Sequence, residues 1–381
     1  MKTFFSDLSE LINFVQIPKV QKSVVFYSEG RDSWLHLEGL IKEFLRITDR
    51  DICYISSDID DPGLLLEDPQ YRSFNINKGH ILNWLFRNIE TDLMVMTTPD
   101  LNTFQLKYSK NKVHYVYVQH SLVSLHMAYR KDAFEHFQTI FCAGPHHKKE
   151  LRAIEQTYNQ PNKNIVEHGY SRLDSILELD YQHMAKNKSI ELLKHVLIAP
   201  SWGENGIVET IGSSLVDLLL KNGFKVTLRP HPQTIKLANK KVQEIVNKHR
   251  ANPLFHLEEK ISSYKSLYES SLMISDWSGA ALDYALGFKK PVLFIDVPKK
   301  INNIDYKEIG IEPLEVSIRS KIGTIISLDK LEDIKLIINE LLEGYISQDY
   351  AQLSNNAVYN LHYADRVGAE ELEKLIIENV K

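Results

Sequence analysis

The stretch SVVFYSEGRDSWLHLEGLIKEFLRI, residues 23–47, decides the fold class. Its first six residues are mostly apolar and predict a buried strand, whereas residues 34–47 have the spacing of an amphipathic helix. Another apolar run follows at 52–56, and further strand candidates lie at 93–98, 114–119 and 139–144, with helical patterns between most of them. Strands that are apolar on both faces and alternate with helices predict a parallel sheet covered by helices.

The same alternation restarts in the second half of the chain. Apolar strand candidates recur there at 195–200, 224–230, 272–276, 291–296 and 325–328. The stretch that separates the two halves, residues 176–194, is polar and helix-prone. We therefore predict an α/β protein with two Rossmann-type lobes whose parallel sheets face a cleft. Residues 1–180 would form the first lobe, 181–360 the second, and 361–381 a C-terminal helix in a position to cross back to the first lobe.

Composition narrows the classes of function. The chain has 381 residues and a net charge of −5, which argues against a general nucleic-acid binder. Both cysteines, Cys53 and Cys142, lie in apolar runs and predict buried thiols in a reducing cytoplasm. No apolar run reaches the ~18–20 residues that span a bilayer, and residues 1–15 lack the basic start and cleavage site of a signal peptide. We therefore expect a cytoplasmic protein.

Ligands of open α/β sheets bind at the carboxyl ends of the strands. Helices open after several of these strand ends, and their free N–H groups and positive dipole ends attract phosphate. The strand ends therefore predict a site for a phosphate-containing ligand. The candidate residues there are Arg31, His120, Ser201, Trp202, Gly203, Arg229, His231, Asp276, Ser278 and Gly279.

The run LRPHPQT, residues 228–234, places two potential cations at one strand end. Prolines on both sides of His231 restrict the backbone and remove two N–H donors, so the imidazole is held at the mouth of the strand. A protonated His231 would stabilise negative charge on a leaving phosphate, while Arg229 would clamp an oxygen or hold the fold. The alternative is a surface turn that merely contains a histidine.

His120 ends a strand of the first lobe and faces the second lobe across the predicted cleft. A neutral imidazole there would take a proton from an incoming hydroxyl group, and the alternative is a hydrogen-bonded structural histidine. In the second lobe, Ser278 would cap its helix and touch a phosphate oxygen, or would only cap. Gly203 and Gly279 would leave room for a ligand to approach the backbone closely.

Three other chemistries lack support in the sequence. The histidines between 120 and 147 come with no cysteine ligand pair and no His-Glu-x-x-His spacing, so we predict no protein-bound metal. The chain has no Gly-x-Ser-x-Gly motif for a serine hydrolase. Its first strand–helix turn lacks the Gly-x-Gly-x-x-Gly fingerprint of a nicotinamide enzyme, and we expect no cofactor.

A set of motifs in a fixed order resembles the CDP-glycerol glycerophosphotransferases, the teichoic-acid primases and polymerases. After a histidine at a first-lobe strand end come Gly-Tyr-x-Arg-x-Asp, Ala-Pro-Ser-Trp, Arg-Pro-His-Pro, Ser-Asp-Trp-Ser, Leu-Asp-Tyr-Ala and Lys-Pro-Val. The set spans about Val113 to Arg366 and is densest from 195 to 296. The resemblance implies a GT-B-like fold, with the acceptor on the first lobe and a CDP-linked donor on the second.

The resemblance also implies roles for individual residues. The family's proposed base falls on His120, and its histidine that contacts the donor diphosphate falls on His231. The acidic and hydroxyl residues of two further motifs fall on Asp276, Ser278 and Asp283, which are therefore expected to bind substrate.

Several positions depart from the family pattern. The Gly-Tyr-Pro-Arg-x-Asp motif has Ser in place of Pro, although Gly169 and Arg172 remain expected substrate contacts. The family's His-Gly-Thr reads His-Ser-Leu, and its second serine is Gly279. Its Ala-Pro-Thr-Trp-Arg ends in Gly203 and so loses a cation, for which Arg31 is a candidate replacement. These changes leave open which nucleotide-linked donor is used.

We predict a transferase that moves a glycerol-phosphate or related alditol-phosphate unit from a CDP-linked donor to a hydroxyl of a cell-surface glycan or lipid-linked acceptor. Such reactions build teichoic acid, capsule or O-antigen. A lipid-linked acceptor would bring the chain to the inner membrane surface, through its N-terminal helix or the cluster Lys148, Lys149 and Arg152. The alternatives are that this helix packs on its own domain and that the cluster is only a solvated charged face. The alternatives are a GT-B glycosyltransferase with a nucleotide-sugar donor, a nucleotide-sugar epimerase, and a non-catalytic nucleotide-binding subunit.

Overall fold

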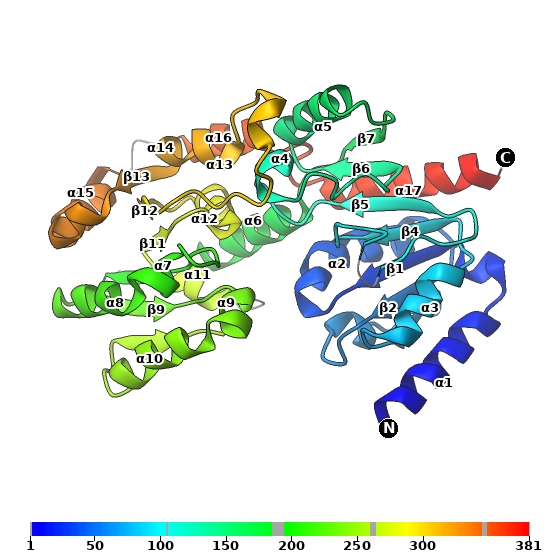
Figure 1. Ribbon diagram of the computed structural model, residues 1–381, viewed down its shortest axis with the longest axis horizontal. Helices are drawn as coiled ribbons and strands as arrows, with labels where there is room; N and C mark the ends of the chain where they lie inside the picture. Colours follow the sequence, from blue (N-terminus) through cyan, green and yellow to red (C-terminus); the bar gives the residue numbers. More distant parts are fainter. Residues whose placement is uncertain (1, 104–105, 185–193, 260–263, 345–348, 381) are drawn as a thin grey trace.

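The chain folds into two lobes that lie side by side, each built on a parallel sheet (Figure 1). The computed structural model describes residues 2–103, 106–184, 194–259, 264–344 and 349–380. The first lobe contains a seven-stranded sheet and the second a six-stranded sheet, and the strand pairs are parallel throughout. This architecture confirms the predicted α/β class with two Rossmann-type lobes.

In the first sheet the strands lie in the order β3-β2-β1-β4-β5-β6-β7. The interior strands are the predicted apolar runs. The edge strands β3 and β7 are not predicted, because they are only partly buried and carry polar residues. The bounds are β1 (Val24–Ser28), β2 (Ile52–Ser56), β3 (Tyr71–Asn75), β4 (Leu93–Met96), β5 (His114–Val118), β6 (Thr139–Cys142) and β7 (Asn164–Glu167).

Helices cover both faces of the first sheet. The helices α1 (Lys2–Gln16), α3 (His80–Asn88) and α5 (Pro145–Thr157) each contribute some apolar side chains to one core. On the other face, α2 (Arg31–Ile47) and α17 (Ala364–Val380) form a second core. The C-terminal helix α17 lies against α2 and therefore packs on the first lobe.

The second sheet repeats this strand order, as β10-β9-β8-β11-β12-β13. In each sheet the order reverses beside the first strand of the lobe, β1 or β8, and open α/β sheets bind ligands at such a reversal. The sequence does not predict the short edge strand β10. The bounds are β8 (His195–Ile198), β9 (Lys225–Leu228), β10 (Phe255–Leu257), β11 (Leu272–Ser275), β12 (Val292–Ile295) and β13 (Gly323–Ile326).

The second sheet is also covered on both faces. One core contains α12 (Gly279–Phe288) and α16 (Tyr350–Ala357), and the other contains α8 (Gly212–Lys221), α10 (Asn239–His249) and α15 (Ile334–Gly344). The chain between β8 and β9 forms two successive helices, α7 (Ile207–Thr210) and α8. A Cβ at Gly212 would lie 2.9 Å from the Ile245 side chain, so the glycine that starts α8 lets α10 pack closely.

The helix α6 (Ser171–Met184) joins the lobes, because it contacts both α2 and α12. The domain boundary expected after residue 180 falls inside this helix, and residues 185–193 of the polar stretch lie outside the described residues. The remaining elements are α4 (Leu125–Ala128), α9 (Pro232–Leu237), α11 (Lys265–Glu269), α13 (Leu314–Ser317), α14 (Arg319–Ile322), η1 (Lys19–Lys22), η2 (Pro62–Leu65), η3 (Tyr306–Ile309) and η4 (Leu328–Asp333).

Candidate active site

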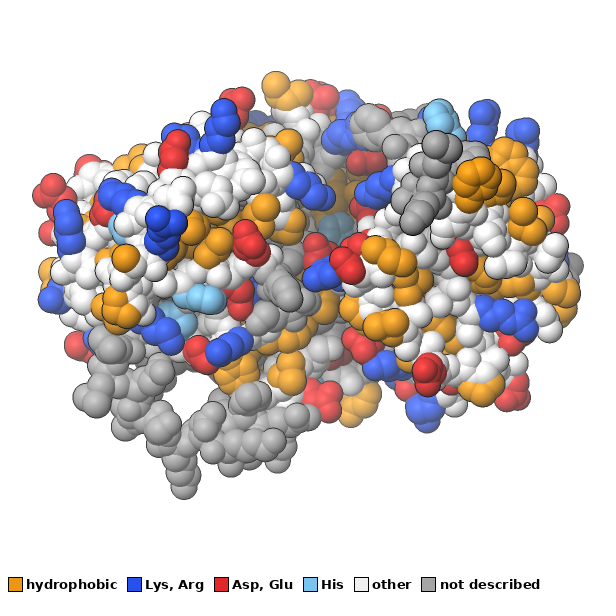
Figure 2. Space-filling view, turned by 90° about the horizontal axis from the view of Figure 1, so that it is seen from below, with side chains coloured by type: hydrophobic (Ala, Val, Ile, Leu, Met, Phe, Trp, Pro, Cys, Tyr) orange, Lys and Arg blue, Asp and Glu red, His pale blue; other side chains and the backbone are white. Residues whose placement is uncertain are grey.

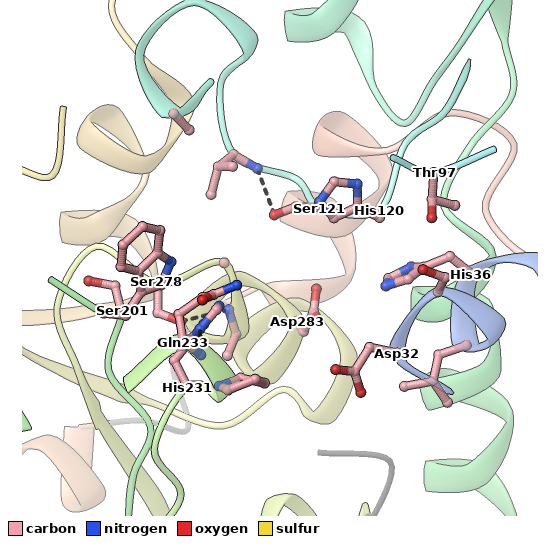
Figure 3. Close-up of a pocket in the computed structure, with 18 of the residues that line it drawn as sticks. Asp32, His36, Thr97, His120, Ser121, Ser201, His231, Gln233, Ser278 and Asp283 are labelled. Carbon is pink, nitrogen blue, oxygen red and sulfur yellow. Dashed lines mark hydrogen bonds between the residues drawn. The ribbon is translucent and has the colours of Figure 1, made fainter. Parts of the chain in front are cut away.

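The carboxyl ends of strands from both sheets meet at one cavity between the lobes. Its volume is about 650 Å³, and Figure 3 shows side chains that enter it from both lobes. In Figure 2 the surface is hollowed between the lobes, with acidic and basic side chains at the edge of the hollow. Ten of the predicted site residues line this cavity: Arg31, His120, Arg172, Ser201, Trp202, Arg229, His231, Ser278, Gly279 and Asp283.

Asp276, predicted to bind substrate, does not line the cavity. Its buried carboxylate accepts the backbone N–H groups of Ser201 at 2.7 Å, Trp277 at 2.6 Å and Ile207 at 3.3 Å. These bonds tie the loop after β8 to the loop after β11. Because the oxygens are already occupied by backbone donors, the geometry assigns Asp276 a supporting role behind the wall in place of a ligand contact.

The predicted contacts Gly169 and Gly203 also lie outside the cavity wall. Gly169 has a φ of +108°, and a Cβ there would lie 2.5 Å from the carbonyl oxygen of Tyr359. Gly203 has a φ of +126°, with open space where a Cβ would stand. Both backbone conformations favour glycine. Gly169 therefore lets two chain segments pass close to each other, and Gly203 provides the backbone conformation that a turn requires.

His120 enters the cavity from the end of β5 and is surrounded by aromatic side chains. Its Nδ1 lies 2.8 Å from the Tyr117 hydroxyl, and its Nε2 lies 3.4 Å from the Tyr129 hydroxyl. The His36 ring, stacked on Tyr170, meets the His120 ring edge-on at 5.9 Å. Burial lowers the pKa of His120 to about 4, so the imidazole is neutral at pH 7. It therefore keeps a lone pair, which a general base needs.

His231 enters from the opposite lobe, at the end of β9. Its Nδ1 accepts the backbone N–H of Gln233 at 3.1 Å and so caps α9. The proton of a neutral ring must then lie on Nε2. Burial, and to a smaller extent Lys300 and Lys236, lower the pKa of His231 to about 3. The predicted protonated imidazole is therefore corrected to a neutral one that offers an Nε2–H donor.

The helix α12 begins at the cavity wall. The hydroxyl of Ser278 accepts the backbone N–H of Ala280 at 3.3 Å and caps the helix. A Cβ added at Gly279 would lie 2.5 Å from the Ser121 hydroxyl of the first lobe. The space that we expected to serve a ligand at Gly279 is therefore used by an approach of the two lobes to each other.

Two predicted arginines are held by carboxylates in the cavity wall. The guanidinium of Arg172 donates to Asp283 at 2.8 Å, and both side chains are largely buried. The second oxygen of Asp283, Oδ1, has no hydrogen-bond partner within the described part of the chain. Arg229 lies 3.2 Å from Glu258, and burial lowers its pKa to about 10. Of the two roles predicted for Arg229, these contacts favour holding the fold.

The structure also places residues at the cavity that the sequence did not predict, among them His36, Tyr129, Gln233 and Lys300. Lys300 lies shortly after β12, so the rule that ligands bind at strand ends, taken at the run 291–296, points to it. His36 and Tyr129 lie within or beside helices and carry no comparable sequence signal.

A family model described as CDP-Glycerol:Poly(glycerophosphate) glycerophosphotransferase matches residues 94–300, more than half of the chain. The chain belongs to this family. It is therefore a transferase, and the matched range includes His120 and His231 of the cavity. A search of curated protein sequences finds no match to the chain.

Solved structures share the fold of this glycerophosphotransferase. The wall teichoic acid polymerase TagF has 14% identity and a TM-score of 0.60, with 100% of this chain and 99% of that chain covered. The Methanocaldococcus jannaschii UDP-GlcNAc 2-epimerase with UDP-GlcNAc and UDP has 14% identity and a TM-score of 0.57, covering 92% and 99%. An S. aureus MnaA–UDP co-structure has 13% identity and a TM-score of 0.57, with 94% of this chain and 97% of that chain covered. These likenesses confirm the GT-B fold.

The described residues of this glycerophosphotransferase contain neither a membrane-spanning helix nor a metal-binding group of side chains. Among the described helices none has the length and apolar character that crossing a membrane requires. Within the same residues, no group of three or more His, Cys, Asp or Glu side chains is arranged to hold a metal ion.

Proposed function

We propose that this glycerophosphotransferase moves a glycerol-phosphate or related alditol-phosphate unit from a CDP-linked donor to a hydroxyl of a cell-surface glycan or lipid-linked acceptor. The observation that carries the proposal is the meeting of two neutral histidines, one from each lobe, in a cavity within the range of the family match. The first lobe would hold the acceptor, and the second lobe would hold the nucleotide donor.

In this proposal His120 is the general base. Its Nδ1–H donates to the Tyr117 oxygen, which leaves the Nε2 lone pair facing the cavity beside Tyr129. The acceptor hydroxyl gives its proton to Nε2 while its oxygen attacks the β-phosphorus of the donor. A new O–P bond forms, the P–O bond to CMP breaks, and CMP leaves with the bonding electrons.

The second lobe stabilises the departing CMP. The Nε2–H of His231 and the N-terminal end of α12 at Ser278 both lie at the cavity wall. They would donate hydrogen bonds to phosphate oxygens as negative charge moves onto the leaving group. In phosphoryl transfer, positioning and electrostatic stabilisation supply most of the catalysis, so rigid placement of these donors is what the reaction requires.

The experiment has a binding step and a product step. Thermal-shift measurements would compare CDP-glycerol, CDP-ribitol, CMP-sugars, UDP-sugars and GDP-sugars, since a ligand of the folded state raises the melting temperature. We expect a CDP-alditol to give the largest shift, and mass measurement of the acceptor product to show a retained phosphodiester. A product that gains a sugar without phosphorus would make the enzyme a glycosyltransferase. Conversion of UDP-GlcNAc without an acceptor would make it an epimerase.

We propose in addition that α1 brings the enzyme to the surface of the membrane that holds a lipid-linked acceptor. Its residues Leu11 and Phe14 pack in the first core, but a second apolar face remains uncovered. The partly exposed side chains on this side, with their exposed fractions, are Phe5 (65%), Leu8 (36%), Ile12 (47%), Val15 (48%) and the neighbouring Trp84 of α3 (51%). An exposed apolar stripe beside a tryptophan is typical of helices that lie in the membrane interface.

Co-sedimentation with anionic phospholipid vesicles tests this contact. We expect Ile12→Glu to reduce vesicle binding several-fold, while Asn13→Glu, a matched change at an exposed polar position of the same helix, has a much smaller effect. Equal vesicle binding by the two variants would contradict the proposal. The alternative cluster on α5 is less suited, because Lys148 is paired with Glu167 and Arg152 with Glu155.

A further inference from the structure

Six cationic side chains line the cavity: Arg31, Lys78, Arg172, Arg229, Lys236 and Lys300. Each of the first four has a carboxylate within ion-pair distance. Lys236 and Lys300 have no such partner within the residues that the structure describes. Lys236 is exposed to solvent on α9, whereas Lys300 is partly buried. Lys300 is thus the partly buried cation of this wall whose charge is not matched by an ion pair.

The position of Lys300 is set by an aromatic ring from another loop. Lys300 follows β12, and its Nζ lies 3.8 Å from the centre of the Trp202 ring, which belongs to the loop after β8. The Trp202 ring is in turn 6.2 Å from the His231 ring. An ammonium over a tryptophan face is attracted by the ring quadrupole, and this contact holds the charge in place without neutralising it.

Lys300 lies on the second-lobe side of the cavity, where the nucleotide donor is proposed to bind. Figure 3 shows Ser201, His231 and Ser278 together on the second-lobe side of the cavity, and Trp202 follows Ser201 directly in the chain. The position after Trp202 is Gly203, which supplies no side chain. The candidate replacement Arg31 lies in the first lobe, and its guanidinium faces Asp60 at 3.7 Å.

We infer that Lys300, supported by Trp202, binds the diphosphate of the nucleotide-linked donor. This inference rests on the proposed function and names the cation of its donor subsite. No carboxylate among the described residues forms an ion pair with Lys300, and the diphosphate would supply the missing negative charge. The ammonium group would in turn neutralise the charge that builds up as CMP leaves. Burial lowers the pKa of Lys300 to about 8, an effect that Asp276 and Glu209 partly offset, and an anion at Nζ would raise this pKa again.

Calorimetric binding of three probes tests the inference: CDP, cytidine and inorganic pyrophosphate. The variant Lys300→Met keeps an unbranched apolar side chain over Trp202 but removes the charge. We expect it to weaken CDP and pyrophosphate binding about tenfold, the effect of one lost charge-assisted contact, and to leave cytidine binding unchanged. Lys300→Arg should stay within about threefold of the parent for all three probes, because it keeps the cation.

The adjacent Lys299 is the matched control, because it is exposed and does not line the cavity. Lys299→Met should bind every probe as the parent does. If Lys300→Met binds CDP and pyrophosphate as tightly as the parent, the lysine serves only to pack on Trp202 and the inference is overturned. The inference is likewise overturned if the parent binds no diphosphate at all.

Pyrophosphate carries no nucleoside, so its binding tests the role of Lys300 independently of the proposed CDP-linked donor. If pyrophosphate binding depends on Lys300 but no CDP-alditol is consumed, the donor assignment fails while the role of Lys300 stands. If CDP-glycerol is consumed equally well by Lys300→Met, the role of Lys300 fails while the proposed function stands. Thermal unfolding without ligand would show whether each variant is folded, and Lys300→Arg keeps the test valid if the methionine variant unfolds.

Discussion

The two lobes present their histidines to the cavity in different ways. In the first lobe, His120 is surrounded by rings, and tyrosine hydroxyls lie near both of its nitrogens. In the second lobe, His231 has one nitrogen occupied by a backbone N–H and stands near Trp202 and Lys300. Both rings are neutral because burial lowers both pKa values, to about 4 and about 3.

This difference shows that the hydrogen-bond partner of Nδ1 decides whether Nε2 of a neutral imidazole can accept a proton or donate a hydrogen bond. A hydroxyl can donate or accept, so Tyr117 allows His120 to place its proton on Nδ1 and to accept another on Nε2. A backbone N–H can only donate, so Gln233 forces the proton of His231 onto Nε2. The first lobe is thereby suited to receive a proton, and the second to donate a hydrogen bond to a phosphate.

The sharpest way to break this comparison is to remove the base. We expect His120→Ala to lower kcat about 10³-fold, because the acceptor hydroxyl would have no group to receive its proton. Binding of the CDP-linked donor should remain near that of the parent, since the donor contacts lie in the second lobe. Steady-state kinetics with calorimetric donor binding would measure both, and a kcat close to the parent value would rule out the base.

The next largest effect is expected at His231. We expect His231→Ala to lower kcat about 10²-fold through loss of the Nε2–H donor. It should also lower the free energy of unfolding by about 1 kcal/mol, because the cap of α9 is lost. His231→Asn is the control, since asparagine restores a cap but its shorter side chain does not reach the phosphate. Recovery of activity together with stability in His231→Asn would show that capping is the whole role of His231.

A smaller effect should come from the partner of the base. We expect Tyr117→Phe to lower kcat about tenfold with little change in the KM of the donor, because Nδ1–H loses its acceptor and the base-competent tautomer is less populated. Tyr129→Phe, which removes the hydroxyl near Nε2, would show whether the two tyrosines are equivalent. A rise in donor KM without a change in kcat would indicate that Tyr117 only shapes the cavity.

The contact between the lobes offers a milder change. Gly279→Ala would place a Cβ 2.5 Å from the Ser121 hydroxyl, so we expect the lobes to separate slightly. The cost should be about 1 kcal/mol, seen as a rise of about fivefold in the KM of the donor. Adding Ser121→Ala should restore the parent KM, because the colliding oxygen is gone. Failure of the double variant to recover would place the strain elsewhere.

The smallest change is expected on moderate acidification. With a pKa of about 4, only about a tenth of His120 is protonated at pH 5, so kcat/KM should be nearly the same at pH 5 and pH 7. Activity should fall only as the pH approaches 4, where the base becomes charged. Initial rates across this range check the prediction, and a loss of activity centred near pH 6.5 would mean that the His120 environment is far more polar than its burial indicates.

The α/β class and its two lobes could be predicted from the sequence because the signals are local. Interior strands such as 52–56 are short apolar runs that need no knowledge of their neighbours. Prolines around His231 and the helix that opens after Ser278 likewise mark strand ends within a few residues. The rule that ligands bind at strand ends then predicted eight of the residues that line the cavity. Edge strands such as β3 were not predicted, because buried and partly exposed residues do not alternate regularly along them.

Only the tertiary structure decided what each group in that wall can do. The charge of His231, the matched charge of Arg172 and the unmatched charge of Lys300 all depend on partners and burial that come from distant parts of the chain. Asp276 was predicted as a ligand but is occupied by backbone donors of two loops, and Gly279 makes room for Ser121 of the other lobe. Strand formation depends on neighbouring residues in the chain, whereas protonation and ion pairing depend on neighbours in space.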